Sequence, residues 1–226
     1  MITLFNQFSK TEQEQEQENL KHIVAEYMGS FEPRLYHFEG YMNTNLYSSQ
    51  STKPFIQNLG NLIGESVEVG HRYFESGEQL KYHLKWPKGT IWENPLTYGT
   101  TAIYISSHAS DKGLELPLGL VTKNDLIRIF NKEFGNFDNI LYFGCCNLFE
   151  DDSFGWDLLE SSHSRGVLGF KNRIGFSVAM LTDLVFFSLF YLYAKKDNPF
   201  EHLKEIYEGV LEAFPVAKDL GFTLYE

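Results

Sequence analysis

The chain of 226 residues has only two cysteines, and they are neighbours, Cys145 and Cys146. This scarcity disfavours a secreted fold held by disulfides and a cysteine-rich zinc module. Basic residues are also few: 19 Lys and Arg stand against 30 Asp and Glu, for a formal net charge of −11. Without a basic excess, the chain is expected neither to coat nucleic acid nor to dock on an anionic membrane.

A secretory signal is also lacking, because the first ten residues contain no basic start followed by a long apolar run. The most apolar stretch, residues 178–194, is short for a bilayer span and contains Asp183. We therefore expect a buried core helix there. The expected location is the cytoplasm, where thiols stay reduced.

Two regions follow from the residue pattern. Residues 1–30 contain a Gln/Glu run that favours a polar N-terminal helical extension, either a solvated leader helix or a docking or regulatory arm. Residues 31–226 form one α/β domain, in which short apolar strands alternate with helices. Uninterrupted apolar strands are typical of a mainly parallel sheet that is covered on both faces.

The elements of this domain can be placed from hydrophobic periodicity and from turn residues. The expected strands are residues 34–38, 66–72, 102–106, 139–143 and 166–170. The expected helices are residues 55–63, 76–86, 156–162 and 200–214, with two more that begin near Thr122 and Ser177. Thr122 has the position of an N-cap, and Asp125 has that of its capping-box partner. A loop is expected over residues 87–100, which contain proline and glycine.

Two residues with catalytic potential follow strands of this set. His108 comes directly after residues 102–106, and Cys146 comes shortly after residues 139–143. One helical crossover separates them, so the two strands point the same way and end at the same edge of the sheet. If the strands are neighbours, an imidazole and a thiol meet there as a Cys/His dyad. A polar loop histidine and a small buried cysteine are the alternative interpretation.

The order of these motifs resembles that of the caspase-like cysteine peptidases, the group of caspases, metacaspases, gingipains and CHAT domains. The similar segments are Ser107-His108-Ala109, a glycine-containing loop (DKGLELP), a helix, and Gly144-Cys145-Cys146-Asn147. Residues 169–172, followed by a long apolar helix, extend the likeness to small bacterial caspase/CHAT-like proteins. The resemblance implies a three-layer αβα sandwich and peptide-bond cleavage. It also implies conditional roles such as stress response, antiphage defence or programmed cell death.

The chain departs from the family pattern at two places. Ala109 stands where the family has glycine; it keeps the backbone N–H for an oxyanion hole but tolerates positive φ poorly. The cysteine pair leaves two registers open, and the likeness favours Cys146 over Cys145 as the nucleophile. Neighbouring residues of a strand face opposite ways, so only one of the two can hold that position.

The resemblance also suggests residues for the substrate cleft. The candidates are Glu39, Asp111, Asp151, Asp152 and Phe170. The acidic loop with Asp151 and Asp152 would favour a basic substrate side chain, with a solvated acidic loop as the alternative. Asp111 would orient His108, face the substrate or stabilise a turn, and Phe170 would line the pocket or belong to the core. No cofactor is expected, and a zinc site built on the adjacent cysteines is disfavoured. The expected partners are a protein or peptide substrate and an activating ligand or partner protein. The competing hypothesis is a catalytically silent caspase-like module that binds a partner or a small ligand.

Overall fold

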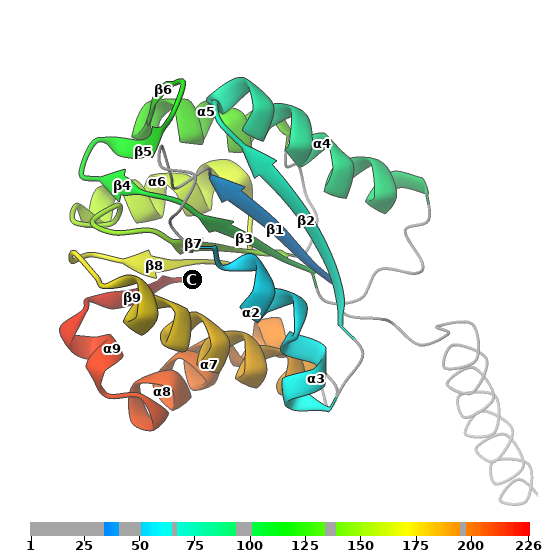
Figure 1. Ribbon diagram of the computed structural model, residues 1–226, viewed down its shortest axis with the longest axis vertical. Coiled ribbons are helices and arrows are strands. Elements are labelled where there is room, and N and C mark those ends of the chain that lie inside the picture. The colour runs from blue at the N-terminus through cyan, green and yellow to red at the C-terminus, as the bar shows by residue number, and fades with distance from the viewer. Residues whose placement is uncertain (1–33, 41–50, 65–66, 94–100, 134–138, 195–197) are drawn as a thin grey trace, which may run out of the picture.

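A six-stranded sheet forms the centre of the molecule (Figure 1). The computed structural model describes residues 34–40, 51–64, 67–93, 101–133, 139–194 and 198–226. Across the sheet, the strands are β2 (Glu68–Phe74), β1 (Arg34–Gly40), β3 (Thr101–Ser106), β7 (Asn139–Gly144), β8 (Gly166–Phe170) and β9 (Phe222–Tyr225). The first five pair in parallel, and β9 runs antiparallel to β8. The predicted α/β class with a mainly parallel sheet is confirmed. The predicted extension over residues 1–30 lies outside the described residues.

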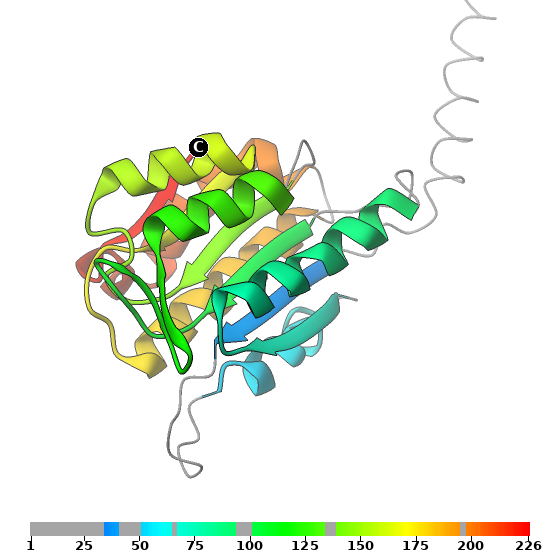
Figure 2. The same ribbon diagram turned by 90° about the horizontal axis from the view of Figure 1, so that it is seen from above.

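Helices cover both faces of this sheet (Figures 1 and 2). One face carries α4 (Gly77–Glu93), α5 (Lys123–Glu133) and α6 (Asp152–Ser162). The other carries α2 (Lys53–Gln57), α3 (Leu59–Ile63), α7 (Phe176–Ala194), α8 (Leu203–Ala213) and α9 (Val216–Asp219), with the 3₁₀ turn η1 (Pro199–His202) before α8. Two hydrophobic cores result, one on each face of the sheet.

The central strands contribute to both cores. In β7, Leu141 and Phe143 belong to the core under α5 and α6, whereas Ile140 and Tyr142 belong to the core under α7. Since successive side chains of a strand point to opposite faces, a strand that is covered on both sides must be apolar throughout. This explains the unbroken apolar run from which the strand was predicted.

The start of α5 has the predicted capping box. The Asp125 N–H donates to Thr122 Oγ1 at 3.1 Å, and the Thr122 N–H donates to Asp125 Oδ2 at 3.1 Å. Each side chain thus satisfies a backbone donor that the first turn of the helix cannot pair. The Thr122 hydroxyl also donates to Asp125 Oδ2 at 2.6 Å, and this bond, together with that from the Thr122 N–H, lowers the pKa of Asp125.

Several elements differ from the sequence prediction. The expected loop after His108 forms a small antiparallel sheet of β4 (Ala109–Ser110), β5 (Gly113–Leu116) and β6 (Gly119–Thr122). Helix α4 continues through Glu93, past Pro87, where a loop was predicted. The edge strand β9 was not predicted, since its four residues are too few to show a period.

Helix α7 is, among the described residues, the one helix long and apolar enough to cross a membrane by length and composition. Its Phe186, Phe187 and Phe190 are fully buried in the core beneath the sheet. Asp183 is buried in the same helix, which a lipid-facing position would not tolerate without a partner. Helix α7 therefore belongs to the core of a globular α/β domain, as the sequence predicts.

Candidate functional site

His108 and Cys146 follow two strands that lie side by side. Strands β3 and β7 pair in parallel with Ser106 opposite Gly144, and each of the two candidates lies two residues beyond that last pair. His108 is exposed, and Cys146 is partly buried. The carboxyl ends of β3 and β7 therefore bring an imidazole and a thiol to one edge of the sheet, where α/β proteins place their sites.

The two cysteines have different surroundings. Cys145 is buried in the core under α5 and α6, and its thiol donates to the Ile105 carbonyl at 3.5 Å. Burial raises the pKa of this thiol well above its usual value, although a hydrogen bond from the Ser107 backbone acts in the opposite direction. The Cys146 thiol donates to the Ile174 carbonyl at 3.4 Å, on the segment that leads into α7. Because a thiolate is the reactive form, Cys145 is poorly suited to act as a nucleophile.

A sharp turn follows Cys146. Asn147 has a φ of +55°, in the left-handed region that asparagine tolerates better than most residues. Its N–H donates to the Asn172 carbonyl at 3.2 Å, and the Phe149 N–H donates to the Phe170 carbonyl at 3.3 Å. The loop after Cys146 is thus held against the segment that follows β8.

The small sheet after His108 sets the direction of the Ala109 backbone. The Glu115 N–H donates to the His108 carbonyl at 2.9 Å, and Ala109 lies opposite Leu114 in the same antiparallel pair. Hydrogen-bonded and non-hydrogen-bonded positions alternate along such a pair, so the Ala109 N–H points away from β5. Among the described residues, positive φ at a non-glycine occurs at Asn147 and His163, so Ala109 has an ordinary backbone conformation.

The acidic cleft candidates other than Glu39 lie at two places, the turn after β4 and the start of α6. Asp111 is exposed in the turn between β4 and β5. Asp151 is the N-cap of α6 and accepts the Ser153 N–H at 2.9 Å. Asp152 forms an ion pair of 2.6 Å with Lys171 and accepts the Tyr225 hydroxyl at 2.7 Å. The charge of Asp152 is thus already paired with Lys171, whereas Asp151 caps α6.

Phe170 is fully buried, and its ring centroid lies 5.3 Å from that of Phe222. It also contacts the Tyr142 ring in the core under α7. The structure therefore places Phe170 in the core packing, which is the alternative interpretation that the sequence left open.

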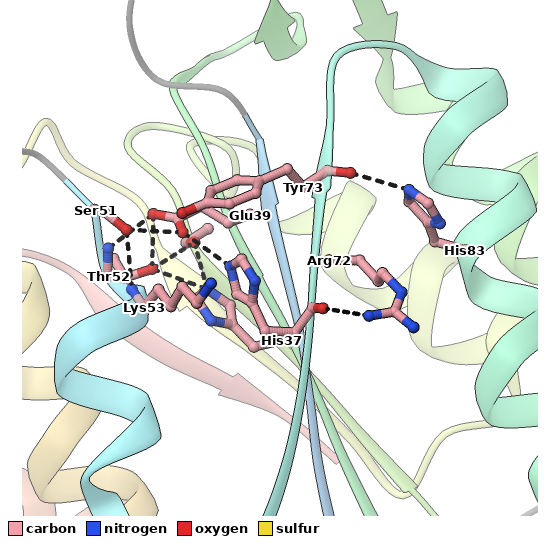
Figure 3. Close-up of polar contacts among 10 residues, drawn as sticks. His37, Glu39, Ser51, Thr52, Lys53, Arg72, Tyr73 and His83 are labelled. Carbon is pink, nitrogen blue, oxygen red and sulfur yellow. Dashed lines mark hydrogen bonds and ion pairs between the residues drawn. The ribbon is translucent and has the colours of Figure 1, made fainter. Parts of the chain in front are cut away.

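Glu39 belongs to a buried polar cluster that sequence reasoning did not assemble (Figure 3). His37 and Glu39 are two residues apart on β1 and face the same side, and His71 of β2 lies opposite His37 in the parallel register. Ser106 of β3 lies opposite Glu39. Thr52, at the start of α2, contacts the cluster from the helix layer that covers the sheet.

Every oxygen of the Glu39 carboxylate has a partner. Oε1 accepts the Thr52 N–H at 2.8 Å, and Oε2 lies 3.0 Å from Ser51 Oγ and 3.1 Å from His71 Nε2. His37 Nε2 lies 2.8 Å from Thr52 Oγ1 and 2.9 Å from Ser106 Oγ. These contacts fix the chain before α2 to the carboxyl end of β1.

Electrostatics keep His37 neutral. Its ring is fully buried, and burial, followed by the nearby His71 and Lys53, holds its pKa well below the usual value. A neutral imidazole is the form that binds a metal. His37, Glu39 and His71 each offer one ligand atom, and these atoms all lie within 4.8 Å of one another. The cluster therefore has the composition of a metal site.

The sequence contained a partial signal for this cluster. His37 and Glu39 have the two-residue spacing of one strand face, and His71 lies in another predicted strand. The missing information was that β1 and β2 are adjacent and that His37 pairs with His71, which no local pattern encodes. For this reason, Glu39 was assigned to the substrate cleft rather than to a cluster with histidines.

A second buried polar group lies beside the cysteine strand. Asp183 accepts hydrogen bonds from Tyr104 at 2.5 Å and from Tyr142 at 2.6 Å. Burial raises the pKa of Asp183 and the two hydrogen bonds lower it. Burial has the larger effect, and the resulting pKa is about 7. The Gly144 backbone passes so close to the Tyr104 hydroxyl that a Cβ at this position would lie 2.7 Å from Tyr104 Oη. The glycine before the cysteine pair thus makes room for the Asp183 network.

Comparison of the chain with protein-family models gave no match, and a search of curated proteins gave no similar sequence.

Proposed function

We propose that the protein is a cysteine peptidase of the caspase-like type, with Cys146 as nucleophile and His108 as its proton acceptor and donor. The observation that carries the proposal is the parallel pairing of β3 and β7, with Ser106 opposite Gly144. It puts the ends of the two strands that precede His108 and Cys146 side by side. The α/β sandwich with a mainly parallel sheet agrees with the architecture that the family resemblance implies.

The burial of the two thiols supports Cys146 as nucleophile. Cys146 is partly exposed at the sheet edge, whereas Cys145 is 1% exposed and lies in the core. An attacking thiolate must reach a substrate carbonyl, so the accessible member of the pair suits the role.

The proposed reaction is acyl transfer through a thioester. His108 takes the proton of the Cys146 thiol, and the thiolate attacks the peptide carbonyl carbon. The N–H groups of Cys146 and Ala109 stabilise the oxyanion; the Ala109 N–H suits this role because it points away from β5. As the C–N bond breaks, His108 returns the proton to the leaving amine. Water, deprotonated by His108, then hydrolyses the thioester and restores the thiol.

The substrate is a protein or peptide, and the family resemblance suggests a cytoplasmic enzyme that an activating ligand or partner protein switches on. A basic substrate residue is less favoured than the sequence suggested. Asp152 pairs with Lys171, so its charge is partly neutralised within the fold, whereas Asp151 accepts hydrogen bonds from Ser153 and keeps its charge.

A fluorogenic peptide library tests the proposal on the full chain. Cys146→Ala and His108→Ala should each abolish turnover, because nucleophile and base act as a unit. Cys145→Ser is the matched control, since serine can keep the hydrogen bonds to Ile105 and Ser107 and should leave turnover intact. Turnover that survives Cys146→Ala would refute the assignment. Absence of turnover under any activating condition, with a Cys146 that does not react with iodoacetamide, would favour the silent binding module.

A further inference from the structure

We propose that His37, Glu39 and His71 bind one zinc ion in a buried site between the sheet and α2. The proposal is independent of the peptidase proposal, because it uses none of the residues assigned to catalysis. Two imidazoles and one carboxylate are an established ligand set for zinc, with a fourth position left for a hydroxyl or a water. Mg²⁺ and Ca²⁺ prefer all-oxygen ligands, so the two imidazoles select against them.

The three candidate ligand side chains would need to move little to bind zinc. Tetrahedral zinc with ligand bonds of about 2.0–2.1 Å holds its ligand atoms about 3.4 Å apart. His71 Nε2 and Glu39 Oε2 are 3.1 Å apart, and all three candidate ligand atoms lie within 4.8 Å of one another. The rings of His37 and His71 are 4.8 Å apart between centroids. A small rotation of the side chains would bring the widest pair into range.

One nitrogen of the His37 ring is buried without a partner in the described part of the chain. His37 Nδ1 is fully buried and has no hydrogen-bond partner among the described residues. Its Nε2 contacts two hydroxyls, either of which can accept the Nε2–H and leave the Nδ1 lone pair unshared. A buried polar atom without a partner is costly, and coordination of a metal by the imidazole is one way to satisfy it.

The surroundings supply an outer shell. Thr52 and Ser51 hold the Glu39 carboxylate, and Ser106 holds the His37 ring. Such hydrogen bonds orient metal ligands and fix the tautomer of a ligating histidine. The Lys53 ammonium opposes a cation here, but it lies over the Tyr73 ring, 5.6 Å from the ring centroid. The competing interpretation is a hydrogen-bonded cluster that anchors α2 without metal.

Calorimetric titration with ZnCl₂ separates these interpretations. The full chain, stripped with a chelator, is used in a Cys145→Ser/Cys146→Ser background, so that thiols cannot bind the metal. One equivalent of zinc should bind, and His37→Gln or His71→Gln should each weaken binding by at least about 100-fold, since loss of an outer-shell partner alone costs 10–100-fold. His83→Gln is the matched control, because His83 contacts the neighbouring Tyr73 carbonyl outside the cluster.

Co²⁺ gives a second readout that does not depend on the stability of the variants. In the wild-type chain, a tetrahedral cobalt site of two histidines and a carboxylate should absorb in the visible range without a thiolate charge-transfer band. A charge-transfer band that Cys146→Ser removes would mean that the metal binds at the cysteines, and it would overturn the proposal. Absence of stoichiometric zinc binding in the cysteine-free background, or binding unchanged by His71→Gln, would also overturn it. Peptidase activity enters none of these measurements, so the two proposals can fail separately.

Discussion

The buried carboxyl of Asp183 predicts a stability that falls as pH rises through neutrality. Burial raises its pKa to about 7 in the folded protein, whereas aspartate in an unfolded chain titrates near 3.9. Between these values, the folded state holds a proton that the unfolded state has released. The resulting stabilisation is fully present below about pH 4 and is lost as the pH passes through about 7.

The size of the effect follows from the two pKa values. From about pH 5.5 to about pH 8.5, this linkage removes about 2 kcal/mol from the free energy of unfolding. Asp183→Asn replaces the carboxyl with an amide that does not titrate and can still accept a hydrogen bond from Tyr104 or Tyr142. The stability of the variant relative to wild type should therefore rise by about 2 kcal/mol over this pH range.

Urea unfolding followed by circular dichroism at several pH values measures this difference. The comparison with wild type matters because the lowered pKa of His37 acts the other way and stabilises the fold as pH rises. Asp157→Asn, at an exposed position of α6, is the matched control and should keep the pH profile of the wild type. The reasoning is refuted if Asp183→Asn and wild type have parallel pH profiles.

Three further outcomes are expected. Thr122→Ala removes the N-cap of α5 and should lower the free energy of unfolding by about 1 kcal/mol in urea titrations; an unchanged midpoint would contradict the capping role. Gly113→Ala should destabilise the fold by more than about 1 kcal/mol, because its φ is +147° and a Cβ would lie 2.0 Å from the Val121 carbonyl oxygen; a neutral result would argue against the β5–β6 pairing. In the native protein, iodoacetamide should modify Cys146 well before Cys145, as peptide mass spectrometry can show; equal rates would contradict the burial of Cys145.

Much of the sheet could be predicted because its strands are local patterns. The run NILYF is apolar on both faces, so burial of β7 from two sides followed directly from its residues. Thr122 and Asp125 likewise indicate the start of α5, because they have the three-residue spacing of a capping box. Such features depend on neighbours in the chain and require no knowledge of the tertiary contacts.

The small sheet after His108 was missed for a different reason. Its strands are two to four residues long, too short for an alternating pattern to show. Gly113 and Gly119, both with positive φ, are the turn residues that could have revealed it. Glycine is common in loops as well as in hairpin turns, so its presence alone does not distinguish the two, and a loop was predicted.

The two candidate sites differ in what they require of the fold. Bringing His108 and Cys146 to one edge requires only that β3 and β7 be adjacent and parallel, and a register shift of one residue would leave both at that edge. The cluster of His37, Glu39 and His71 requires a specific register. A slip of one residue between β1 and β2 would move the His71 side chain to the opposite face of the sheet from His37 and Glu39. The adjacency of β1 and β2 and their register are both set by packing between distant parts of the chain, which the local sequence does not encode. The histidine–glutamate cluster was therefore inaccessible to sequence reasoning, although all its residues lay in predicted strands or beside them.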